Sequence, residues 1–64
     1  MKLKDLKKGK SFMPHLGGYE GRWVPPIWQK IEYDRKKRGW ICYEVEGKRV
    51  AYFYPQEEIK EVYL

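Results

Sequence analysis

The sequence predicts a small all-β domain of about five strands, with a long loop between the first strands and a 3-10 turn before the last strand. Two observations indicate this class. Residues 27–54 form three runs in which apolar and polar side chains alternate, as in half-buried strands. Two turn signals divide these runs, the charged stretch 34–39 and the step at Glu46 and Gly47. Together they predict a three-stranded antiparallel meander.

The length of 64 residues allows one domain, residues 1–64, with a thin core. A chain of this size buries only about 60% of the surface that its unfolded form exposes. Cys42 is the only cysteine and His15 the only histidine, so neither an internal disulfide nor an ordinary zinc site is expected. We therefore expect no metal and no cofactor, and the aromatic residues, 17% of the chain, must supply most of the packing.

The first elements precede a segment rich in glycine and proline. Leu3 and Leu6 are expected to dock a short first element, and residues 11–13 to form the first strand. Residues 14–26 contain too many glycines and prolines for a long helix or a central strand. We interpret them as a long loop, and such loops in compact domains are often functional.

The meander and the last strand follow. Its strands are predicted at 27–34, 40–46 and 48–54, and Gly47 is expected to take a positive φ in the hairpin between the last two. Pro55 ends the third of these strands, since proline donates no ladder hydrogen bond. Residues 55–58 fit a 3-10 turn with proline at its first position, and residues 59–64 fit a short last strand.

Alternation gives the meander two faces, and we predict that the uncharged one is the core. That face carries Ile41, Tyr43, Val45, Val50, Tyr52 and Tyr54. The other face carries Trp40, Cys42, Glu44, Arg49, Ala51 and Phe53. The opposite assignment has support, because Cys42 and Ala51 are small residues of the kind found in cores. A one-residue shift of register between the first two strands of the meander would also exchange the residues that pair across them. On the preferred assignment Trp28, Trp40 and Phe53 lie on the outside.

This order of elements resembles the small SH3-like barrels. The matching residues are Leu6-Lys7-Lys8-Gly9 before the first strand, Trp40 after the charged turn, Gly47 at the hairpin tip and Pro55 before the 3-10 turn. Signalling SH3 domains bind proline-rich peptides with an ALYDY-like stretch, a tryptophan and a Pro-x-x-Tyr motif. Here only Trp40 matches, and Glu58 stands in place of the tyrosine, so the resemblance does not imply that ligand. The chain also looks similar to the SH3-like proteins of phages and mobile elements.

The net charge of +5 suggests an anionic partner. Our first hypothesis is a non-enzymatic module that binds DNA or RNA, in which aromatic rings stack on bases and cations contact phosphates. The candidate binding residues are Trp23, Trp28, Arg35, Lys36, Lys37, Arg38, Trp40 and Phe53. The alternative is a module that binds a protein partner or a second copy of itself. In the plainer interpretation the cations only solubilise the chain, and the long loop covers the rings.

Catalysis and membrane insertion have little support in the sequence. A nucleophile and base pair can be drawn only from Ser11 or Cys42 with His15, so we predict no enzyme. The chain begins with a charged segment and has no apolar run near the roughly 20 residues of a membrane span. A cytoplasmic protein without a membrane partner is expected. The absence of Asn and Thr beside abundant Lys and Glu is similar to thermophile compositions.

Overall fold

The computed structural model describes residues 1–14 and 26–63, and Trp23 of the predicted binding residues lies outside these ranges. The described part holds a 3-10 helix, η1 (Leu3–Asp5), and strands β1 (Ser11–Pro14), β2 (Trp28–Asp34), β3 (Gly39–Glu44), β4 (Val50–Phe53) and β5 (Ile59–Val62). The all-β prediction is confirmed, and the strands begin and end close to the predicted positions. The predicted loop 14–26 falls largely on residues outside the described part.

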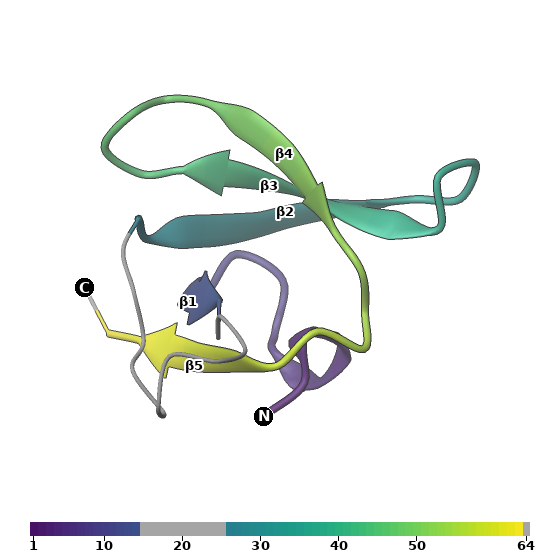
Figure 1. The fold of residues 1–64 in the computed structure, drawn as a ribbon, viewed down its shortest axis with the longest axis horizontal. Helices are drawn as coiled ribbons and strands as arrows, with labels where there is room; N and C mark the ends of the chain where they lie inside the picture. Colours follow the sequence, from purple (N-terminus) through teal and green to yellow (C-terminus); the bar gives the residue numbers. More distant parts are fainter. Residues whose placement is uncertain (15–25, 64) are drawn as a thin grey trace.

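The five strands form one antiparallel sheet in the order β4-β3-β2-β1-β5. Figure 1 shows the meander β2–β3–β4 on one side of the molecule and β1 and β5 on the other. The sheet is strongly curved, because Phe12 of β1 meets Phe53 of β4 with ring centroids 5.4 Å apart although two strands separate them in the sheet. In the described residues no ladder joins the edge strands β4 and β5, so the sheet is not closed into a barrel.

The core lies inside this curve. Its buried members come from η1, the segment after it, and four of the strands: Leu3, Leu6, Phe12, Trp28, Cys42 and Ile59. Trp40, Ala51 and Phe53 pack against them. The Trp28 and Phe53 rings meet edge to face at 5.0 Å. Leu3 and Leu6 are buried as the sequence predicted, and they carry the N-terminal segment into the core.

The predicted core face of the meander is wrong. Val50, Tyr52 and Tyr54 are 61%, 43% and 61% exposed, whereas Cys42 on the opposite face is fully buried. The Trp28, Trp40 and Phe53 rings therefore lie on the inner side, not on the outside. Cys42 and Ala51 are paired across β3 and β4, and their small side chains leave room beneath the sheet for the large rings.

The face of the meander that carries Cys42 can be buried although it bears charges, because its two buried charged residues, Lys30 and Glu44, both have partners. The carboxylate of Glu44 is bound by the Arg49 guanidinium, at 2.5 Å from Nε to Oε1. This hydrogen bond holds the pKa of Glu44 below its usual value. The ammonium of Lys30 donates to the carbonyls of Leu3 and Leu6 and lies 3.9 Å from the Trp40 ring centroid. A buried polar group is tolerated when its hydrogen bonds are made.

A β-bulge in β2 shifts its second half by one position. Lys30 pairs with Cys42, and Glu32 rather than Ile31 pairs with Ile41. Beyond the bulge the parity is therefore reversed, and Tyr33 pairs with Trp40, with ring centroids 5.4 Å apart. In a regular strand the alternation would place Ile27, Ile31 and Tyr33 on one face, and the bulge moves Tyr33 to the other.

Each hairpin loop of the meander contains one non-glycine residue in the left-handed region. Arg38 is the last residue of the loop 35–38, with φ 54°, and Lys48 is the fourth residue of the loop 45–49, with φ 57°. The prediction that Gly47 takes the positive φ is wrong, because Lys48 takes it instead. Gly47 leaves space for the Glu44 carboxylate, which would have to shift if a Cβ were present there.

The turn before β5 is shorter than the predicted 3-10 element. One hydrogen bond of the 3-10 type, from the Glu57 amide to the Tyr54 carbonyl at 3.1 Å, closes it. The neighbouring carbonyls of Pro55 and Glu57 accept hydrogen bonds from the amides of Lys4 and Leu3. The 3-10 helix of the described residues is η1, which lies along this turn (Figure 1).

Candidate nucleic-acid interface

The outer surface of the meander is an apolar and aromatic face. Val50, Tyr52 and Tyr54 on this face are exposed, and Ile41 and Tyr43 are half-buried. All five alternate with the core residues of β3 and β4. We call this set the tyrosine face. Ile41 pairs with Tyr52, and Tyr43 pairs with Val50, so aliphatic and aromatic side chains lie opposite each other across the two strands. Its three tyrosines are therefore presented outward by a rigid sheet.

The loop between β2 and β3 places four cations at one end of this face. Arg35, Lys36, Lys37 and Arg38 are all exposed, and we call them the basic turn. Asp34 shapes the loop, because its Oδ1 accepts the amide hydrogens of Lys36 at 2.9 Å and Lys37 at 3.2 Å. A carboxylate used in this way fixes the backbone of a tight turn. The cations therefore project from an ordered loop.

One contact joins the basic turn to the tyrosine face. The Nζ of Lys37 lies over the Tyr52 ring, 4.1 Å from its centroid. Such a cation–π contact holds the ammonium above the electron-rich ring. A positive charge and an exposed ring thus lie close enough for one ligand to contact both.

Tyr54 extends the aromatic surface toward the basic turn. It is 61% exposed and follows the last residue of β4. A Cβ added at Gly39 would lie 3.8 Å from its ring carbon Cδ1, so the tyrosine covers the backbone where the basic turn ends. The tighter approach at Gly39 is to the Phe53 backbone, because a Cβ there would lie 3.3 Å from the Phe53 carbonyl oxygen. The ring and the cations of the turn therefore share one end of the meander.

The sequence-predicted binding residues divide into two groups in the structure. The cations at 35–38 are exposed and adjacent to aromatic rings, although these are tyrosines. Trp28 is only 7% exposed, and Phe53 packs between it and Phe12. Trp40 lies between the Lys30 ammonium and the Tyr33 ring on the inner side of the sheet. The three rings inside the curve stabilise the core.

The sequence assigned Tyr43, Tyr52 and Tyr54 to the core, and one signal argued otherwise. A buried tyrosine needs a hydrogen-bond partner for its hydroxyl. The runs that accompany these tyrosines, Ile41 to Val45 and Val50 to Tyr54, supply only aliphatic neighbours on the same face. Rings with a polar tip on a half-exposed sheet satisfy the hydroxyl with water instead.

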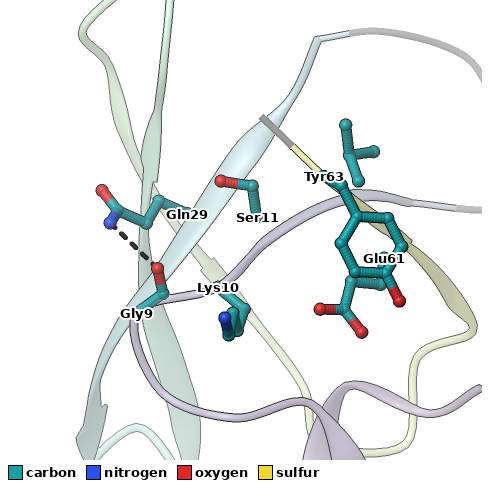
Figure 2. A pocket seen from close by; sticks show the side chains of 7 residues that line it. Gly9, Lys10, Ser11, Gln29, Glu61 and Tyr63 are labelled. Carbon is teal, nitrogen blue, oxygen red and sulfur yellow. Dashed lines mark hydrogen bonds between the residues drawn. The ribbon is translucent and has the colours of Figure 1, made fainter.

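The pocket in Figure 2 lies on a different part of the molecule. Its volume is about 350 Å³, and its lining is Gly9, Lys10, Ser11, Gln29, Glu61, Val62 and Tyr63. The Gln29 amide is already used, since Nε2 donates to the Gly9 carbonyl at 3.1 Å. One lysine and one glutamate balance each other in charge, so this pocket offers no excess positive charge to an anion.

The single thiol of the chain is buried in β3. Burial raises the pKa of the Cys42 thiol to about 12, which keeps it protonated near neutral pH. Residues 1–14 and 26–63 contain no group of three or more His, Cys, Asp or Glu side chains placed to hold a metal ion. In the same ranges no helix has the length and apolar character needed to cross a bilayer.

Comparison with known proteins adds no family to this description. No protein-family model matches the chain, and no curated protein or solved structure is significantly similar to it.

Proposed function

We propose that this protein is a small SH3-like module that binds nucleic acid through the tyrosine face and the basic turn, without catalysing a reaction. The antiparallel order β4-β3-β2-β1-β5, with a turn before β5, supports the SH3-like assignment. The contact between Lys37 and Tyr52 carries the functional proposal. It brings a phosphate-binding cation and a ring that can stack on a base into one site.

Unbalanced positive charge around the tyrosine face is concentrated at the basic turn. Lys48 is exposed in the hairpin loop at the other end of the meander, but Glu46 in the same loop is exposed as well and offsets its charge. Arg49 is engaged by Glu44 and contributes little free charge. Glu32, opposite Ile41, places one carboxylate at the β2 border of the tyrosine face. A polyanion therefore meets unbalanced cations at the basic turn and avoids Glu32 when it follows β3 and β4.

The test compares two variants with the same change in net charge. In the first, Arg35, Lys36, Lys37 and Arg38 are replaced by Ser. In the second, Lys4, Lys7, Lys8 and Lys10 are replaced by Ser; all four are exposed and belong to the N-terminal part of the chain. Binding of a fluorescent oligonucleotide is followed by anisotropy at low salt. We expect the first variant to lose binding and the second to retain most of it.

Two results would contradict the proposal. Wild-type protein that shows no binding at low salt has no nucleic-acid function of this kind, because electrostatic attraction is strongest there. An equal loss in both variants would mean that net charge alone, and not the basic turn, attracts the oligonucleotide. Far-UV circular dichroism of both variants establishes that the fold is retained.

A second candidate, pairing with another copy of the chain, has its own observation. Among the described residues β4 is an edge strand that pairs with β3 alone, and none of its four residues is charged. Unprotected edges of this kind pair readily with a second strand. Light scattering across a concentration series tests it: a mass that stays at 7.8 kDa would exclude a homodimer.

A further inference from the structure

We propose that the tyrosine face binds single-stranded nucleic acid, with neighbouring bases stacked on Tyr52 and Tyr43 and the adjoining phosphate held by the basic turn. This inference rests on the proposed function and specifies its ligand. It follows from the spacing of the rings, from the chemistry between them and from the place of the Lys37 ammonium.

The spacing of the two rings suits bases that are not stacked on each other. Tyr52 pairs with Ile41, and Tyr43 lies two residues further along β3, so the tyrosines are diagonal neighbours across two strands. Residues in that relation are about 7–8 Å apart. Successive bases of a duplex strand are only about 3.4 Å apart. Both rings are therefore engaged together only by a strand whose bases have separated.

The side chains between the rings also favour stacking over reading of base edges. Ile41 and Val50 occupy the positions opposite the tyrosines and offer no hydrogen-bonding groups. Recognition of a duplex in its major groove requires donors and acceptors directed at base edges. Stacking needs only an accessible base face, which a single strand exposes and a duplex hides between neighbouring base pairs.

Lys37 gives the site a way to couple phosphate binding to stacking. In the free protein its ammonium lies over the Tyr52 ring, at 4.1 Å from the centroid. A phosphate oxygen is a stronger partner for an ammonium than an exposed ring. Arrival of a phosphate therefore draws Lys37 off the ring, and the uncovered ring receives the neighbouring base.

The experiment measures affinity for oligothymidylate, oligouridylate and a mixed-sequence duplex of the same length, at one low salt concentration. We expect both single strands to bind at least about tenfold more tightly than the duplex. Tyr43→Ala and Tyr52→Ala should each weaken single-strand binding about tenfold and leave duplex binding unchanged. The two single strands distinguish DNA from RNA as the source of the ligand.

Two controls separate stacking from other effects. Tyr63→Ala removes a tyrosine that is 85% exposed beyond β5, away from the tyrosine face, and should not change affinity. Tyr43→Phe and Tyr52→Phe keep the rings and should retain single-strand binding. They also remain informative if an alanine variant fails to fold, since a loss of binding in folded Phe variants would contradict stacking as the main contact.

The outcomes distinguish this inference from the proposed function. Equal affinity for single strands and duplex, unaffected by the tyrosine variants but weakened by loss of the basic turn, overturns the single-strand inference and leaves the proposed function intact. Absence of binding by the wild-type protein to all three nucleic acids overturns both.

Discussion

Lys48 occupies a backbone conformation that suits glycine better than lysine. Its φ of 57° places it in the left-handed region within the hairpin loop between β3 and β4. For residues with a Cβ this region costs about 1–2 kcal/mol, because the Cβ approaches the following carbonyl oxygen. The hairpin stores this strain because the hydrogen bonds between Glu44 and residues 48 and 49 fix the loop.

We predict that Lys48→Gly raises the free energy of unfolding by about 1 kcal/mol, since glycine takes a positive φ without steric cost. Urea denaturation followed by tryptophan fluorescence measures the change. Glu46→Gly in the same loop is the matched control. Glu46 has no positive φ, so this change adds only flexibility to the unfolded chain and should lower stability slightly. Equal effects of the two substitutions would contradict the argument.

Cys42 should make the folded state sensitive to alkaline pH. Burial raises the pKa of its thiol from 9.0 to about 12. Between these values the unfolded chain loses the thiol proton while the folded chain keeps it, so the unfolded state gains stability. The contribution of Cys42 to stability is therefore complete below pH 9.0 and is lost as the pH rises toward 12.

Cys42→Ala isolates this effect, because alanine fits the site and does not titrate. We predict that the difference in unfolding free energy between the wild type and Cys42→Ala declines steadily as the pH rises above 9.0. Guanidinium denaturation at a series of pH values, under reducing conditions, measures it. Lys30 acts in the opposite direction, since burial lowers its pKa. It is present in both proteins, and only its coupling to the Cys42 thiolate, which raises the pKa of Lys30, differs between them. A difference that does not change with pH would refute the prediction.

At the scale of elements, one side chain couples the N-terminal segment to the meander. The Lys30 ammonium reaches from β2 to the carbonyls of Leu3 and Leu6, at 2.8 Å and 2.5 Å. The Leu3 carbonyl also accepts the Leu6 amide hydrogen. Removal of the lysine would therefore leave mainly the Leu6 carbonyl without a hydrogen-bond donor. η1 in turn is bonded to the turn before β5. Lys30 therefore links three parts of the chain that are distant in sequence.

Replacement of Lys30 by Met keeps the length of the side chain and removes its donors. We predict a loss of about 1–3 kcal/mol, the usual cost of an unsatisfied buried acceptor. Amide hydrogen exchange should accelerate more in residues 3–6 than in β3, because the contact holds the N-terminal segment locally. A uniform acceleration over the whole chain, or no loss of stability, would show that Lys30 does not have this coupling role.

The sequence predicted the strands well because alternation and turn residues are local signals. It did not predict the core face, since that depended on partners distant in sequence. Glu44 is neutralised by a residue across the hairpin, and Lys30 by carbonyls of the N-terminal segment. Neither pairing is visible in a count of charges on a face. The β2 bulge is equally hidden, because Ile27, Ile31 and Tyr33 keep the spacing of a regular strand although the pairing shifts between Lys30 and Glu32.

In the candidate site, too, the local feature was predictable and the feature that depends on distant residues was not. The basic turn was predictable, since four consecutive cations between two strands are almost always exposed. The identity of its aromatic partners depended on the choice of core face, and the tyrosines and tryptophans exchanged places when that choice proved wrong. In a domain this small both faces of the meander carry aromatic residues, so composition alone does not distinguish them.

At the scale of the whole molecule, the net charge of +5 and the basic turn act over different distances. The N-terminal lysines contribute to a general attraction, which salt screens beyond about 10 Å at 0.1 M ionic strength. Direct contacts with phosphates instead release bound counterions, and each contributes about 0.7 to the slope of log affinity against log salt for a single strand. Salt dependence therefore separates a local site from a diffuse field.

We predict that the variant with Ser at Lys4, Lys7, Lys8 and Lys10 binds oligothymidylate more weakly than wild type at low salt, and that the two affinities converge near physiological salt. The slope of the variant with Ser at positions 35–38 should be smaller by up to about 3, as four lost phosphate contacts require. Its affinity should therefore still lie well below that of wild type at physiological salt, and the two should approach each other only at much higher salt. Anisotropy titrations over a range of salt concentrations measure both slopes. If both variants already reach the wild-type affinity near physiological salt, the attraction belongs to the net charge of the molecule, and the basic turn does not contact phosphate.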